Sequence, residues 1–377
     1  MNLQIAVIIS IFGLCVTMPL FVRYFAYANM PSWAKFLGLV LCLAVAILPV
    51  FASRDWTHVY GSYFALIEYT LYFIYIFAVI LFSLTIMRDI IWGIFSIFKS
   101  IPSPFNPDAF SKVNFITVIL ALICTGWSLY EGTKVPNEKH LSLTSPKIQQ
   151  EKTLVMLSDL HISRSVSPAK IKAIVDKTNA LKPDIILLAG DIVDDDVHVI
   201  QDTTALLANL TAKQGVYFVS GNHEFYIGYK PAMRAMEQIG LISVENKKIA
   251  IESNFYVSGV SDIPTTMRLG GHPKAKEVLS NIPKSAFTVF MSHSPTPLDL
   301  PYDLQVSGHT HGGQIFPFHI FSWLGNHHLL AGLYPKDRIY VSRGSGQWGP
   351  QMRFLAPSEI TVIHLLPANN INIEKTK

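Results

Sequence analysis

The sequence predicts an α/β domain preceded by a bundle of transmembrane helices. Two observations support this prediction. The first is composition: half of the 377 residues are apolar and only 15% are charged, which is too apolar for an ordinary soluble protein. The second is a change of pattern along the chain. Long apolar runs fill the chain before residue 132, and short apolar runs with polar ends follow from residue 153.

Residues 1–132 contain about four apolar runs that we interpret as transmembrane spans. They are Leu3–Val22, Phe36–Ala52, Tyr63–Met87 and a shorter, marginal Phe115–Leu129. No Lys or Arg precedes the first run, so we interpret it as an uncleaved span rather than a signal peptide. The run Ile90–Phe98 is too short to span alone. It is either an interfacial helix or a continuation of the third span.

Cations in the loops predict the side of the membrane on which the rest of the chain lies. They follow the first and third spans, at Arg23 and Lys35 and then at Arg88, Lys99 and Lys112. The loop between the second and third spans has only Arg54. By the positive-inside rule, the domain after residue 132 is therefore extracytoplasmic in a multi-pass protein of the cell membrane. This prediction reverses if Phe115–Leu129 does not span.

The chain after the bundle divides into a linker, an α/β domain and a tail. Residues 133–152 are polar and rich in turn formers, which indicates a linker. Between residues 153 and 366, apolar runs alternate with helical patterns, which predicts layers of strands and helices. Runs such as DIILLAG are apolar throughout, as expected of strands buried on both faces. Residues 367–377 form a C-terminal tail.

Side chains that can bind metal ions follow one predicted strand after another in this domain. They are Asp159 and His161 after TLVMLS, Asp191 after DIILLAG, Asn222 and His223 after GVYFVSG, His293 after FTVFMS, and His309 and His311 after LQVSG. Each motif alone is commonplace, because Asp and Asn at strand ends often serve turns and helix caps. In α/β sheets, however, ligands bind at the carboxyl ends of strands. The series therefore predicts one shared site.

The residue types indicate the chemistry of this site. All three cysteines lie in the first region, so the domain has neither a disulfide framework nor a thiolate zinc site. Imidazole and carboxylate ligands suit Mn, Zn or Fe better than Ca or Mg. The ligands are too many for one ion, whereas two ions with a bridging carboxylate fit. Two ions about 3.5–4 Å apart are typical of phosphoester hydrolysis by a shared hydroxide. The net charge of +4, without a basic block, gives no indication of nucleic acid.

The ordered motifs SDLH, GD, GNHE, SHSP and GHTHGGQ resemble those of the calcineurin-like metallophosphoesterases, especially their membrane-anchored bacterial branch. The resemblance covers residues 153–366 and implies a four-layer α/β sandwich with two mixed sheets. It implies that one ion is held by Asp159, His161, Asp191 and His311, and a second by Asp191, Asn222, His293 and His309. Asp191 would bridge the two ions. The resemblance also implies that His223 protonates the leaving group or stabilises the transition state.

Three other features have two interpretations each. The carboxylates Asp194, Asp195 and Asp196 form a solvated turn or support the metal ligands. Glu224 orients His223 or faces water. The apolar segment Phe316–Tyr334 is packed in a core or forms a wall that touches the bilayer or an acyl chain.

The predicted function is hydrolysis of a phosphomono- or diester, which is lipid-linked or belongs to the cell envelope. The resemblance offers a narrower alternative, a pyrophosphatase acting on UDP-2,3-diacylglucosamine in lipid A synthesis. That substrate requires a cytoplasmic active site and so conflicts with the predicted orientation. A third alternative is a non-catalytic, metal-stabilised membrane scaffold or sensor. The intact His223 argues against it, because a scaffold needs no proton donor.

Overall fold

The computed structural model describes residues 3–52, 64–98 and 107–368, which form parts of two compact units. The first unit comprises Met1–Tyr130 and Gly349–Phe354, and the second comprises Glu131–Trp348 and Leu355–Lys377. Some predicted features lie outside the described residues: the start of the third span at Tyr63, the loop cations Arg54 and Lys99, and most of the tail 367–377.

The first unit is helical. Its helices are α1 (Leu3–Phe21), the short π-helix η1 (Val22–Ala26), α2 (Ser32–Ala52), α4 (Phe64–Phe98) and α5 (Pro107–Thr133). Three stretches are long and apolar enough to cross a membrane, namely Val7–Ala26, Leu66–Phe98 and Lys112–Thr133, whereas the apolar stretch of α2, Ser32–Leu48, is shorter. The number of spans therefore stays a prediction. Residues Ile90–Phe98 continue α4 and do not form a separate interfacial helix.

Close contacts and one charged cluster join the helices of the first unit. A Cβ at Gly13 would lie 2.7 Å from the carbonyl oxygen of Ala46, so glycine lets α1 approach α2. Arg23 Nε of η1 lies 2.9 Å from Asp89 Oδ2 of α4, which ties these two helices together. Near the chain's other end, the backbone N–H of Arg353 donates to Ser128 O on α5 at 2.8 Å. The segment Gly349–Phe354 thus belongs with these helices.

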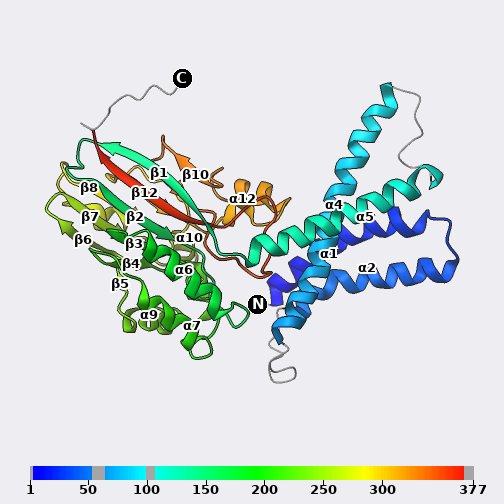
Figure 1. The fold of residues 1–377 in the computed structure, drawn as a ribbon, viewed down its shortest axis with the longest axis horizontal. Coiled ribbons are helices and arrows are strands. Elements are labelled where there is room, and N and C mark those ends of the chain that lie inside the picture. Colours follow the sequence, from blue (N-terminus) through cyan, green and yellow to red (C-terminus); the bar gives the residue numbers. More distant parts are fainter. Residues whose placement is uncertain (1–2, 53–63, 99–106, 369–377) are drawn as a thin grey trace. The chain divides into compact units, whose positions relative to one another are not determined.

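The second unit contains two six-stranded sheets (Figure 1). The first sheet has the order β1 (Asn137–Ser145), β12 (Glu359–Pro367), β2 (Lys152–Leu157), β3 (Ile185–Ala189), β4 (Val216–Val219) and β5 (Ile242–Ser243). The second has the order β10 (Gly332–Tyr334), β11 (Ile339–Val341), β9 (Leu304–Ser307), β8 (Phe287–Met291), β7 (Phe255–Gly259) and β6 (Lys247–Glu252). Strand β12 runs antiparallel to β2, and β6 and β10 run antiparallel to their neighbours, so both sheets are mixed.

The two sheets pack face to face, with helices outside them. Leu154 and Met156 of β2 share one core with residues of the second sheet, whereas Val155 and Leu157 face the other way, toward α6 and α9. The helices of this unit are α6 (Pro168–Ala180), α7 (Gln201–Ala205), η3 (Leu206–Asn209), α8 (Asn222–Ile227), α9 (Tyr229–Gln238), α10 (Ile263–Arg268), α11 (Ala275–Leu279), η4 (His311–Gly313) and α12 (Phe318–Gly325). Residues of α10 and α11 cover the outer face of the second sheet. The predicted four-layer α/β sandwich with two mixed sheets is confirmed.

The predicted linker, residues 133–152, is structured and has to be corrected. Residues Asn137–Ser145 form β1, an edge strand that pairs in parallel with β12 along its whole length. One face of β1 is exposed, and only Leu141 and Leu143 pack against the core between the sheets. An edge strand that buries so few side chains has the polar composition of a linker, which explains the wrong interpretation.

Candidate metal centre

The predicted ligands lie in the loops that leave the carboxyl ends of neighbouring strands. Asp159 and His161 follow β2, Asp191 follows β3, and Asn222 and His223 begin α8 directly after β4. In the second sheet, His293 follows β8, and His309 and His311 follow β9. Because these strands are parallel to their neighbours, their carboxyl ends lie along one edge of each sheet. The fold therefore gathers residues that are far apart in the sequence.

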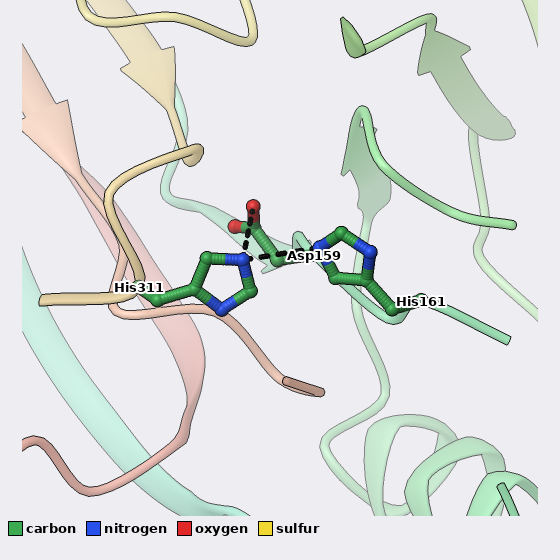
Figure 2. Close-up of side chains that lie close together, drawn as sticks. All are labelled: Asp159, His161 and His311. Atoms are coloured by element: carbon green, nitrogen blue, oxygen red, sulfur yellow. Dashed lines mark hydrogen bonds and ion pairs between the residues drawn. The ribbon is translucent and has the colours of Figure 1, made fainter. Parts of the chain in front are cut away.

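The first group of side chains is Asp159, His161 and His311, which point toward one another (Figure 2). The Nε2 atoms of the two histidines are 3.0 Å apart, and His311 Nε2 lies 3.5 Å from Asp159 Oδ1. Nitrogen ligands bound at about 2.0–2.1 Å to one ion, roughly at right angles, would be separated by about 3 Å. The spacing therefore suits two imidazoles that share an ion.

The second group is Asp191, His293 and His309. His293 Nε2 lies 3.0 Å from Asp191 Oδ2, and the same carboxylate oxygen lies 3.6 Å from His161 Nε2 of the first group. Asp191 thus stands between the groups. Burial alone would raise its pKa, but the charges of His293 and His223 hold the pKa of Asp191 well below its ordinary value.

Buried polar atoms test whether a metal ion fits this arrangement. Among the described residues, His293 Nε2 and Asn222 Oδ1 are buried and make no hydrogen bond. The other ring nitrogen of His293, Nδ1, is 2.8 Å from the carbonyl oxygen of Ala189, which fixes the ring with Nε2 facing Asp191. Metal-binding histidines are typically oriented in this way, and an unsatisfied buried polar atom is otherwise costly. The donor set fits a divalent cation.

The backbone at the predicted ligands is unusual. Five of the seven predicted ligands have a positive φ, between 45° and 70°: Asp159, His161, Asp191, His309 and His311. For a residue other than glycine, such a conformation costs about 1–3 kcal/mol and is concentrated at functional sites. Close approach also explains Gly308, where a Cβ would overlap Ser158 Oγ and a carboxylate oxygen of Asp159. The unusual backbone conformation of these loops directs the side chains toward the site.

His223 lies beside the first group and is paired with Asp194. Its Nδ1 is 2.5 Å from Asp194 Oδ1, and its ring meets the ring of His161 edge to face at 4.6 Å. Burial would lower the pKa of His223, but the charge of Asp191 and the hydrogen bond to Asp194 raise it to about 9. These contacts favour the protonated form of the imidazole. Of the two interpretations of Asp194, support of the site agrees with these contacts, whereas Asp195 pairs with Arg164 at 2.6 Å.

Comparisons with known proteins agree with this geometry. The model of the calcineurin-like phosphoesterase family matches residues 152–313. A metallophosphoesterase of Helicobacter pylori is 32% identical over 69% of this chain and 71% of its own length. This chain belongs to the calcineurin-like phosphoesterase family. The predicted family and the predicted enzyme class, a phosphoester hydrolase, are thereby confirmed.

Further relatives of this calcineurin-like phosphoesterase match over most of its length. A metallophosphoesterase of Campylobacter jejuni is 26% identical over 88% of each chain. A "transmembrane protein with metallophosphoesterase domain" of Danio rerio is 27% identical over 69% of this chain and 65% of its own length. The family uses divalent metal ions, and the two groups described above are the candidate ligands in this phosphoesterase.

Glu224 follows His223 and braces the loop that carries Asp191. It is buried, and its carboxylate accepts hydrogen bonds from the backbone N–H groups of Asp191, Ile192, Val193 and Gly221, at 2.7–3.1 Å. Burial and the charge of Asp191 raise the pKa of Glu224. Facing water is therefore the wrong interpretation. The GNHE motif places this carboxylate where it holds the backbone of the loop that carries Asp191.

Two aromatic side chains beside His223 were not anticipated from the sequence. The ring centroids of Tyr226 and Trp348 lie 5.1 and 5.9 Å from that of His223. Tyr226 could have been recognised, since a residue three positions after His223 on a helix lies on the same face. Trp348 could not, because it approaches from a distant part of the chain through contacts of Gln314, the last residue of GHTHGGQ.

Proposed function

We propose that this protein is a membrane-anchored phosphoesterase with two divalent ions. Asp159, His161, Asp191 and His311 would hold one ion, and Asp191, Asn222, His293 and His309 the other. One observation carries the proposal: a single oxygen of Asp191 lies 3.0 Å from a nitrogen of His293 and 3.6 Å from a nitrogen of His161. That is the placement of a bridging carboxylate between two histidine groups.

The residues of this chain have separate roles in the proposed reaction. When bound, two divalent ions supply a nucleophile at neutral pH and neutralise the phosphate oxygens. His223 uses Nδ1 for Asp194, which leaves Nε2 to donate a proton to the leaving oxygen. Asp194 orients that ring and stabilises its charge. Glu224 keeps the backbone around Asp191 in place through its four hydrogen bonds.

Activity measurements on the full-length protein in detergent test the catalytic part of the proposal. Aryl phosphodiesters and monoesters are incubated with Mn²⁺, Zn²⁺ or Fe²⁺, and release of the phenol is followed. We expect turnover that Asp191→Asn abolishes and Asp195→Asn retains, since Asp195 pairs with Arg164 on the same loop. Equal activity of the two variants would contradict the proposed metal centre.

The surface next to the site supports a lipid-linked substrate. None of the residues of α12, which follows the GHTHGGQ turn, is buried, and Ile320, Phe321 and Leu324 are each more than half exposed. The interpretation of Phe316–Tyr334 as packed core is therefore wrong for α12, although Leu329 of the same segment is buried. An exposed apolar helix is typical of a segment that lies in a membrane interface or contacts acyl chains. Together with the apolar helices of the first unit, it favours an amphiphilic phosphoester.

Two measurements test the substrate and the orientation. Phe321→Ser should lower hydrolysis of a diacyl phosphoester in mixed micelles and leave hydrolysis of a soluble aryl phosphodiester unchanged, whereas a parallel loss on both would contradict a lipid-binding role for α12. A reporter enzyme fused to the C-terminus, active only outside the cytoplasm, tests the predicted extracytoplasmic domain. An intact fusion protein without reporter activity would place the domain in the cytoplasm and would instead favour the pyrophosphatase of lipid A synthesis.

A further inference from the structure

Two large aromatic side chains flank the proposed proton donor while remaining open to solvent. Tyr226 is 53% exposed and Trp348 is 40% exposed, yet each ring is within 6 Å of the His223 ring, centroid to centroid. Both rings are tilted by more than 60° from the imidazole plane. We call these two residues the aromatic pair. Exposed aromatic rings that remain accessible beside reactive groups are typical of binding sites.

Each member of the aromatic pair is held in place by polar contacts. The backbone of Trp348 is bound twice by the side chain of Gln314, which donates from Nε2 to the carbonyl oxygen at 2.8 Å and accepts from the N–H at 3.1 Å. The hydroxyl of Tyr226 accepts a hydrogen bond from Arg268 Nη2 at 3.1 Å, and the guanidinium lies 5.6 Å from the ring centroid. Gln314 leaves the same turn as His311. The turn that carries His311 thus also positions Trp348.

The proton donor determines which part of a substrate lies against the aromatic pair. Because Asp194 binds Nδ1 of His223, the nitrogen that serves the substrate is Nε2. A general acid must come within hydrogen-bond distance of the oxygen that it protonates, and here that oxygen belongs to the departing group. The group attached to this oxygen therefore lies next to the His223 ring, within reach of Tyr226 and Trp348.

We propose that Tyr226 and Trp348 bind the leaving group, and that the site prefers phosphoesters whose leaving group carries a flat unsaturated ring. The inference rests on the proposed function, since it takes His223 as the proton donor. Stacking suits such a ring because its face meets the faces of aromatic side chains, and removal of one stacking partner typically lowers binding about 5- to 100-fold. A compact aliphatic leaving group gains little from the same contacts.

Two matched phosphodiesters test this preference with the full-length protein in detergent and Mn²⁺. Methyl phenyl phosphate and methyl hexafluoroisopropyl phosphate differ in the shape of the leaving group, while the two departing alcohols are of similar acidity. We expect Trp348→Ala and Tyr226→Ala to lower kcat/KM for the phenyl ester about tenfold and for the fluoroalkyl ester less than about threefold. Trp348→Phe should restore the preference. Leu269→Ala, an exposed apolar residue next to Arg268, is the control and should change neither.

The outcomes separate this inference from the proposed function. Equal losses on both esters, or failure of Trp348→Phe to restore the preference, would overturn the role of the aromatic pair and leave the metal centre standing. No turnover of either ester by the unmodified protein would contradict the proposed function and this inference together. Metal content and melting temperature of each variant, expected to be unchanged, show that lost activity is not lost folding.

Discussion

The two groups of metal-binding side chains are built from similar residues but have different neighbours. In the first group, His161 lies against the His223 ring and within 3.4 Å of a carboxylate oxygen of Asp194. In the second, His293 is fully buried and fixed by the carbonyl oxygen of Ala189 at the end of β3. The first group thus adjoins the proposed proton donor, His223, whereas the second is anchored to the end of a strand.

This difference indicates that the two groups have different roles within one centre. Burial would lower the pKa of His293, but the charge of Asp191 raises it well above its ordinary value. Burial and the nearby charge of His293 lower the pKa of His309. A second group anchored to backbone would hold its ion with little freedom. In the proposed reaction, the first group would link its ion to proton transfer, because His161 lies against the ring of His223. Asp191 lies between the two groups. Substitutions at Asp191, in either group and at the residues beside them should therefore differ in how much activity they remove.

Asp191→Asn should have the largest effect, because it removes the one carboxylate that reaches both groups. We expect loss of both ions and a fall in kcat/KM larger than the ~10²–10⁴-fold that a proton donor alone contributes. Metal analysis of the purified variant and activity at saturating Mn²⁺ are the measurements. If one full equivalent of metal stayed bound, the bridging position of Asp191 would be wrong.

His311→Ala and His309→Ala form a matched pair, one from each group on the same turn. Each should lose one ion and keep the other, with most of the activity gone. At a metal concentration of about 100 times Kd, one bound ion stabilises the folded state by about 2.7 kcal/mol, so each variant should lose roughly that much. Thermal unfolding with and without Mn²⁺ measures the loss. Complete metal loss in either variant would show that the groups do not bind independently.

His223→Ala should leave the metal content unchanged and lower kcat by about 10²–10⁴-fold, because the side chain donates a proton without holding an ion. The loss should shrink for substrates with more acidic leaving groups, which need less protonation. A uniform loss across a series of substituted phenyl esters would argue against general acid catalysis by His223.

The candidate ligands could be proposed from the sequence because residues of metal-binding type stand at the ends of predicted strands. Asp159, Asp191 and His293 each follow a run of apolar residues that is buried on both faces, so strand ends and ligands could be read together. The layered fold was predicted from the same apolar runs. Strand β1 was not predicted, because an edge strand with one exposed face has the composition of a loop.

Other parts of the site depend on information that the sequence does not express. Within the run Asp194–Asp196, one carboxylate contacts His223, while its neighbour Asp195 pairs with Arg164. Which of the three adjacent acids turns inward depends on the path of the backbone, and composition does not reveal that path. Trp348 lies near His223 and is bound at its backbone by Gln314, which is a contact between two loops.

Asp194→Asn should have the smallest effect on activity in this series, and it tests the coupling of the first group to proton transfer. Asp194 touches His223 and supports it, so we expect about a 10–100-fold loss, as for other residues that orient functional side chains. The hydrogen bond to Asp194 contributes to the raised pKa of His223. Without that charge the pKa of His223 falls, the imidazolium loses its proton at lower pH, and the alkaline limit of activity should move to lower pH.

The pH profile of kcat for Asp194→Asn, compared with Asp195→Asn, decides whether this coupling exists. Both variants remove one negative charge from the same loop, so a general electrostatic effect would shift both profiles alike. A shift confined to Asp194→Asn would tie the effect to the hydrogen bond with His223, because Asp195 instead pairs with Arg164. Unshifted profiles in both variants would mean that Asp194 orients the His223 ring without changing its pKa. The first group would then resemble the second, because its neighbours would only hold side chains in place.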